Sequence, residues 1–162
     1  MTAENNSKIY GDEDPDFVVN VEGEKSGSPI TYTVARTEGE NVGKYPITVT
    51  ITSDTKNYDL TVKNAEFEIK KADVTVTAEN NSKIYGDTDP ELKVTVTGEK
   101  MSKIEYTVAR VEGDDVGHYD ITVTLTGNTS NYNIKQTQGD FEIKNLPRRK
   151  NSERLSIWMI SP

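Results

Sequence analysis

The chain has 162 residues, no cysteine and a formal net charge of −8, so disulfide scaffolds and thiolate metal sites are excluded. The negative charge lies in residues 1–144, because residues 145–162 carry a net +3, and such an acidic surface repels phosphate groups. No apolar segment reaches the ~20 residues that span a bilayer, so we expect neither nucleic-acid binding nor direct membrane insertion.

An internal repeat organises the sequence. Residues 2–12 and residues 77–87 have the same eleven letters, TAENNSKIYGD, and the match continues with one residue dropped from the second copy. Tandem copies of a small unit are typical of arrays in which length or valency matters. We therefore predict repeat domain 1 over residues 1–71 with its first strand truncated, repeat domain 2 over residues 72–144, and a non-repeat basic and apolar tail over residues 145–162.

Short alternating runs of Val, Ile, Thr and Tyr predict strands, with no helix signal of ordinary length between them. In residues 119–126, for example, every second residue is apolar and the others are Asp or Thr. In the second repeat we expect strands at residues 74–78, 82–85, 92–97, 104–110, 119–126, 132–136 and 141–144. Seven short strands favour an all-β chain of two tandem immunoglobulin-like β-sandwich domains. The alternative is a smaller β-grasp-like unit, since about 72 residues is short for seven strands.

Acidic turns follow the second predicted strand of each repeat, in the pattern Gly-Asp-x-Asp-Pro. Their carboxylates belong to Asp12, Asp14, Asp87 and Asp89, and carboxylate oxygens are ligands for calcium. The same pattern is a good turn in which aspartates accept backbone N–H groups, and no twelve-residue calcium loop is present. We expect turns here, with calcium as the weaker alternative and no other cofactor.

Tyr45 and Tyr119 each follow a turn and a Gly-x pair, and each begins an alternating apolar strand. This pattern is typical of a tyrosine corner, in which the phenol bonds back to upstream backbone. We predict that both side chains are buried at equivalent corners; the alternative is a strand-initial tyrosine without that bond. The only histidine, His118, has no nucleophile to pair with, so we expect no enzymatic activity.

The junction between the repeats, residues 67–78, contains no Gly, Pro or Ser and alternates nearly throughout. Flexible linkers are rich in Gly and Ser. We therefore predict that the last strand of the first repeat runs almost directly into the first strand of the second, which makes the connection stiff.

The ordered motifs together resemble a known family. Lys-Ile-Tyr-Gly-Asp-x-Asp-Pro at residues 8–15 and 83–90 is followed in both copies by Val-Gly-x-Tyr, Asn-Tyr and Phe-Glu-Ile. This order resembles the MBG-type ("mostly beta, glycine-rich") repeats of bacterial surface proteins. The resemblance implies a fragment of a larger exported protein, extracellular at the bacterial cell surface, with adhesin-like architecture. It transfers no catalytic residues.

We therefore expect a non-catalytic stalk or spacer that supports adhesion, with neighbouring repeats of the same parent chain as its partners. Alternatively, each repeat binds a host glycan or matrix protein through tyrosines that both copies share. These ligand-facing candidates, which would be core residues if buried, are Tyr10, Tyr85, Tyr58 and Tyr132. A more distant alternative is an accessory domain of an extracellular hydrolase. Intramolecular isopeptide crosslinks between Lys and Asn or acidic side chains would add strength without cysteine, but no pair stands out.

The missing first strand of repeat domain 1 predicts an unpaired sheet edge, which is a template for another strand. In the tail, residues 155–160 are apolar enough to pair with it. A frayed terminus is the alternative.

Overall fold

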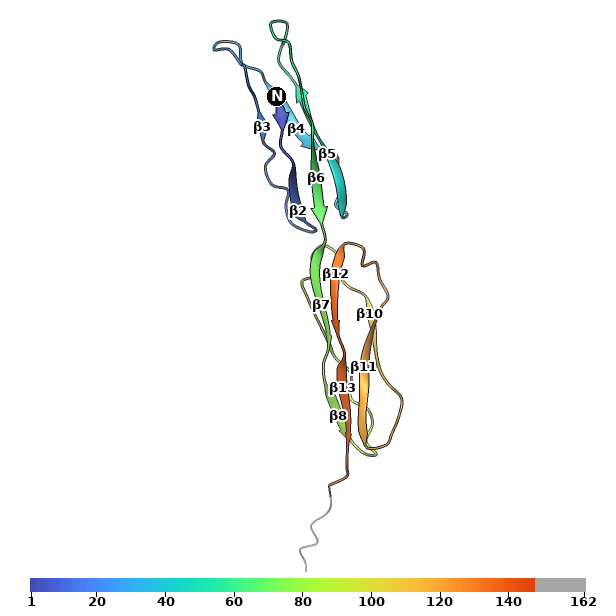
Figure 1. Cartoon of the computed structure of the whole chain (residues 1–162). Helices are drawn as coiled ribbons and strands as arrows, with labels where there is room; N and C mark the ends of the chain where they lie inside the picture. Colours follow the sequence, from blue (N-terminus) through green and yellow to red (C-terminus); the bar gives the residue numbers. More distant parts are fainter. Residues whose placement is uncertain (148–162) are drawn as a thin grey trace, which may run out of the picture.

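The chain's structure, a computed structural model, describes residues 1–147, which contain thirteen strands and no helix. Within these residues no helix is long and apolar enough to cross a membrane. The strands form two similar halves arranged end to end (Figure 1). The first half contains β1 (Thr2–Ala3), β2 (Asn6–Ile9), β3 (Val19–Asn20), β4 (Tyr32–Arg36), β5 (Gly43–Ile51) and β6 (Ala65–Lys70). The second half contains β7 (Ala72–Ala78), β8 (Asn81–Ile84), β9 (Val94–Thr97), β10 (Tyr106–Arg110), β11 (Gly117–Leu125), β12 (Tyr132–Thr137) and β13 (Gly139–Lys144).

Each half has one four-stranded sheet with the same pairing. The order is β2-β6-β5-β4 in the first half and β8-β13-β11-β10 in the second. In both sheets the first pair is parallel and the others are antiparallel. The all-β prediction is therefore confirmed, and the two halves are alike, but neither the immunoglobulin-like sandwich nor the β-grasp-like alternative is shown.

Alternation along the long central strands places the core. In β5 the side chains of Ile47 and Val49 are buried while those of Thr48 and Thr50 are exposed, as a strand with one face in the core requires. The next strand adds Phe67, which is fully buried and lies opposite Tyr45. In the second half Phe141 takes the same place opposite Tyr119.

The smaller sheets differ between the halves. In the second half, β7 has seven residues and pairs in parallel with β12 and antiparallel with β9. In the first half, β1 has two residues and pairs with β3. Residues 58–62, the counterparts of the first part of β12, form no strand; beside them lies Met1, the counterpart of Val76, whose amino group donates to the Thr61 carbonyl over 2.9 Å. The tail segment 155–160, which we expected to pair with this edge, lies outside the described residues.

The connection between the halves is a single residue. β6 ends at Lys70 and β7 begins at Ala72, so an almost continuous strand crosses from one half to the other (Figure 1). Ala72 also donates its backbone N–H to the carbonyl of Asn131 over 3.1 Å, which fixes the chain as soon as it enters the second half.

Tyr45 and Tyr119 bond back to upstream backbone in the same way. The Tyr45 hydroxyl donates to the carbonyl of Asn41 over 2.7 Å, and the Tyr119 hydroxyl donates to the carbonyl of Asp115 over 2.8 Å. Both rings are half-buried rather than buried. The expectation of full burial is wrong because each hydroxyl must reach an exposed turn, which keeps one edge of the ring at the surface.

We expect Tyr119→Phe to lower the free energy of unfolding by about 0.5–1.5 kcal/mol, because it removes one hydrogen-bond donor and keeps the ring. Tyr106→Phe is the matched control, since Tyr106 is exposed and its hydroxyl makes no hydrogen bond within residues 1–147. Denaturant unfolding of both variants measures the difference. Equal losses in the two variants would show that the Tyr119 bond adds no stability.

Candidate functional site

The stretch that is identical in both copies includes the end of β2 and the turn that follows it. Lys8 and Tyr10 lie on one face of the strand and are buried, while Ile9 points outward and is exposed. Gly11 then takes a φ of +84°, in the region that favours glycine, and the N–H of Asp12 bonds to the carbonyl of Ile9 over 3.0 Å. This turn brings Tyr10 to the end of the first half.

A cluster of four charged side chains fixes the position of this turn. The Lys8 ammonium lies 2.7 Å from an Asp14 oxygen and 2.5 Å from a Glu40 oxygen. Arg36 contacts Asp14 through Nε and Nη2 and lies 2.6 Å from Glu40. The Lys8 and Arg36 side chains are only 4% and 7% exposed. Buried cations are tolerated when carboxylates and further hydrogen bonds compensate for lost water, and here two carboxylates do so.

The second copy has the same cluster in a looser form. Asp89 lies 2.7 Å from the Lys83 ammonium and 2.5 Å from the Arg110 Nε. Asp114, the counterpart of Glu40, lies 3.5 Å from Lys83 and 3.7 Å from Arg110. The Arg110 guanidinium also stacks 4.8 Å from the centre of the Phe141 ring. The cluster therefore ties the acidic turn to the core of each half.

These contacts hold both partners in their charged forms. The hydrogen bond from Arg110, followed by the one from Lys83, lowers the pKa of Asp89 to about 2. The hydrogen bond from Arg36 lowers the pKa of Asp14 in the same direction, against the opposing effect of burial. Burial acts to lower the pKa of Lys8, but hydrogen bonds to Asp14 and Glu40 together outweigh it and raise that pKa.

The same geometry bears on two expectations for these aspartates. Asp14 and Asp89 face cations that would repel a calcium ion, and in the described part of the chain no three His, Cys, Asp or Glu side chains group as metal ligands. Lys8 and Asp14 are also the kind of pair that could form an isopeptide bond. That reaction needs an uncharged amine and a protonated carboxyl, and the pKa shifts of both groups favour the opposite forms.

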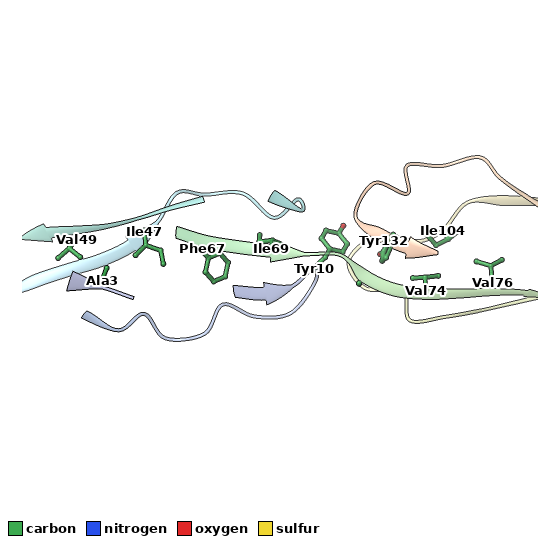
Figure 2. Close-up of a cluster of buried hydrophobic side chains, with 11 residues drawn as sticks. Ala3, Tyr10, Ile47, Val49, Phe67, Ile69, Val74, Val76, Ile104 and Tyr132 are labelled. Carbon is green, nitrogen blue, oxygen red and sulfur yellow. The ribbon is translucent and has the colours of Figure 1, made fainter. Parts of the chain in front are cut away.

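The Tyr10 ring packs against the second half of the molecule. It meets the Tyr132 ring edge to face, with the ring centres 5.3 Å apart and the planes at 86°. Figure 2 shows the pair beside the strand that crosses between the halves. Tyr10 is 5% exposed and Tyr132 is 3% exposed. The Tyr132 hydroxyl donates to the Ser102 carbonyl over 2.6 Å and accepts from the Lys100 N–H over 3.2 Å, so this buried polar group is satisfied.

Polar contacts flank the tyrosine pair. The Lys100 ammonium lies 3.0 Å from Asp12. The Asn131 side chain accepts from the Val42 N–H over 2.9 Å and donates to the Asn41 side chain over 3.0 Å. With the strand crossing as a further attachment, the two halves are joined at several points around one buried aromatic pair.

The tyrosines proposed to face a ligand are placed in two different ways. Tyr10 and Tyr132 do not face solvent, and that expectation is wrong for them because each covers the other between the halves. Their counterparts lie at the outer ends of the molecule: Tyr85 is 46% exposed, and Tyr58 is half-buried with its hydroxyl bonded to the Ser28 carbonyl over 2.7 Å. Tyrosines at equivalent positions of the two copies therefore differ in burial.

Sequence reasoning missed several residues of this contact: Asn41, Lys100, Ser102 and Asn131. A signal was available, because Lys100 and Asn131 have counterparts at Lys25 and Asn57 in the first copy. It did not indicate an interface, since exposed lysines and asparagines are ordinary in loops.

His118 pairs with an acidic side chain at the surface. Its Nδ1 lies 2.8 Å from an Asp140 oxygen, and that hydrogen bond raises the pKa of the imidazole. The first copy has Lys44 and Glu66 at the same two positions, 2.7 Å apart. Both copies therefore use these positions for a polar pair between neighbouring strands.

We expect Asp89→Asn to weaken the dependence of stability on acid. The pKa of Asp89 is lower in the folded chain, about 2, than the ~3.9 of an unfolded aspartate. Its contribution is therefore present above about pH 4 and is lost as the pH falls toward 2. Denaturant unfolding at pH 5 and at pH 2 should show a smaller loss for Asp89→Asn than for the unchanged chain. Asp87→Asn, in the same turn but without an ion pair in the described residues, is the control; an equal loss in both variants would contradict the assignment.

We expect Gly11→Ala to loosen the contact between the halves, because a Cβ at Gly11 would lie 2.4 Å from the Lys100 Cβ. Gly86→Ala is the matched control: its φ of +90° gives similar backbone strain, but nothing lies within 4 Å of its Cβ position. Spin labels at Thr50→Cys and Thr124→Cys report the distance between the halves by pulsed electron paramagnetic resonance. The distribution should broaden or shift in Gly11→Ala and stay as in the unchanged chain in Gly86→Ala. Equal distributions would show that close approach at Gly11 is not needed.

The family comparison agrees with the internal repeat. The model of the MBG domain (YGX type) matches residues 1–68 and again residues 74–142. Each match contains the Tyr-Gly step, as Tyr10-Gly11 and as Tyr85-Gly86, that forms the turn described above. A comparison with curated protein sequences finds no match. Since the two matches together cover most of the chain, the protein belongs to the MBG domain (YGX type) family and contains two tandem units of it.

Proposed function

We propose that the chain is a non-catalytic spacer of a bacterial cell-surface protein, which holds a binding region away from the cell and so supports adhesion. Membership of a family of repeats that is typical of surface proteins supports the location. The geometry of the junction supports the mechanical role.

The observation that carries the proposal is the joint between the units. A Gly/Ser linker would let them move independently, but here one residue separates β6 from β7. The Tyr10–Tyr132 pair is buried beside that strand, and the ion pair of Asp12 with Lys100 adds a contact outside it. Bending at the joint would break these contacts, so the units keep a fixed direction relative to each other.

The surface suits a spacer as well. The outward positions of β5 and of its counterpart β11 are largely Thr and charged residues, and the repeats carry a strong net negative charge. Like charge keeps neighbouring arrays apart in solution. We also propose that each unit is an immunoglobulin-like sandwich; the packing of β11 against β7 supports this for the second unit.

A glycan- or protein-binding role for every unit is the weaker function. Such a site would use an aromatic surface that both copies present to solvent. Two of the four shared tyrosines, Tyr10 and Tyr132, are buried between the units instead. An array therefore covers these side chains wherever two units meet.

Surface labelling tests the location. Antibodies raised against residues 1–144 should label intact cells of the bacterium that makes the protein, and brief protease treatment of those cells should remove the signal. Labelling that appears only after the cells are permeabilised would contradict the proposal.

A binding screen tests the role. The chain should bind no glycan or matrix protein more strongly than an unrelated acidic β protein does. Binding that saturates and is lost in Tyr85→Ala, an exposed position, would favour the binding-module function instead.

A further inference from the structure

Each unit has two different end faces, and the structure shows one pair of them in contact. The Tyr10 face consists of Tyr10, Asp12, Asn41 and Val42, at one end of the first unit. The Tyr132 face consists of Lys100, Ser102, Asn131 and Tyr132, at the near end of the second unit. Repetition of the sequence creates a second pair of such faces at the two outer ends of the molecule.

The outer faces have the same residues as the inner faces at every position but one. The Tyr85 face, at the far end of the second unit, consists of Tyr85, Asp87, Asp115 and Val116. The Tyr58 face, at the far end of the first unit, consists of Lys25, Ser28, Asn57 and Tyr58. Asp115 replaces Asn41, and either side chain offers the oxygen that Asn41 uses to accept from an asparagine.

The Tyr58 face has the same hydrogen bonds as the Tyr132 face, which is in contact with the first unit. The Tyr58 hydroxyl donates to the Ser28 carbonyl over 2.7 Å and accepts from the Lys25 N–H over 3.1 Å. These are the two bonds that Tyr132 makes with Ser102 and Lys100. The ring is therefore held in place without a partner.

The Tyr85 face has exposed apolar side chains that nothing covers within the described residues. Tyr85 and Val116 are each 46% exposed, whereas Tyr10 in the occupied contact is 5% exposed. With Asp115, Asn145 and Leu146 they line a hollow of about 370 Å³. In the inner joint the ring of Tyr132 packs against Tyr10, the counterpart of Tyr85.

We propose that the Tyr85 face binds the Tyr58 face of a second copy of this chain, which associates the chains head to tail. Tyr85 packs on Tyr58, and Asp87 pairs with Lys25, as Tyr10 and Asp12 do with Tyr132 and Lys100. The two faces differ, so the contact does not close on itself and association continues into linear assemblies.

This association goes beyond the spacer role, which requires only the inner joint. The inner joint benefits from the covalent strand, which raises the effective concentration of its two faces to roughly millimolar. Faces on two separate chains have no such link, so their association depends on protein concentration.

Sedimentation of the full chain from about 10 μM to 1 mM tests the proposal. The average mass should rise with concentration for the unchanged chain. Tyr85→Ala and Tyr58→Ala should each stay monomeric, because each lacks one of the two faces. An equimolar mixture of the two variants should form a one-to-one dimer that grows no further, since one good face of each kind remains. A monomeric unchanged chain at 1 mM, self-association of either variant, or a monomeric mixture would overturn the proposal.

Charge reversal provides a second set of variants that leaves the folded unit intact, because Lys25 and Asp87 are both exposed. Lys25→Asp and Asp87→Lys should each weaken association by about fivefold or more at low salt, and the chain with both changes should recover it. Without recovery in the double variant, the Asp87–Lys25 pairing is wrong and the proposed contact falls with it.

Discussion

The arrangement of the two units depends on one edge-to-face contact between Tyr10 and Tyr132. A strand that passes between domains through one residue limits their separation, but by itself it leaves them free to twist and bend. The tyrosine pair, with the polar contacts around it, removes that freedom because both rings are almost fully buried and the Tyr132 hydroxyl is bonded to backbone. Such pairs contribute about 0.5–1.5 kcal/mol beyond the burial of their area, and bending would expose both rings to water.

The contact in turn depends on the buried charges beneath the turn. Tyr10 can reach Tyr132 only if the turn after Ile9 keeps its direction. Asp14, four residues after Tyr10, is fixed between the Lys8 and Arg36 side chains. Burying two cations is unfavourable unless carboxylates compensate for it. Once the cluster forms, any movement of the turn separates these charges, so the cluster favours one orientation of Tyr10. The second copy has the same kind of cluster around Asp89, and it fixes the turn that carries Tyr85 in the same way.

Much of this fold is predictable from the letters, because alternating apolar residues and turn formers act locally. The strand at residues 119–126, the direct junction and the family follow from pattern and repetition. The different burial of Tyr10 and Tyr85 cannot be predicted in this way. Both residues follow the same Lys-Ile pair, and only the presence of a neighbouring unit distinguishes them. The charge cluster was equally hidden: Arg36 is 22 residues from Asp14, and its approach requires the pairing of β4 with β5. The half-burial of Tyr45 also depends on the turn that its hydroxyl reaches.

The most direct test of the rigid joint is a measurement of residual dipolar couplings of backbone N–H groups, at a concentration where the chain is monomeric. Couplings from the first and second units should fit one alignment tensor with one magnitude and one set of axes, because the buried pair holds both units in one frame. Two tensors of different magnitude would mean that the units reorient independently, and would contradict the account of the Tyr10–Tyr132 contact as the constraint that fixes the molecule.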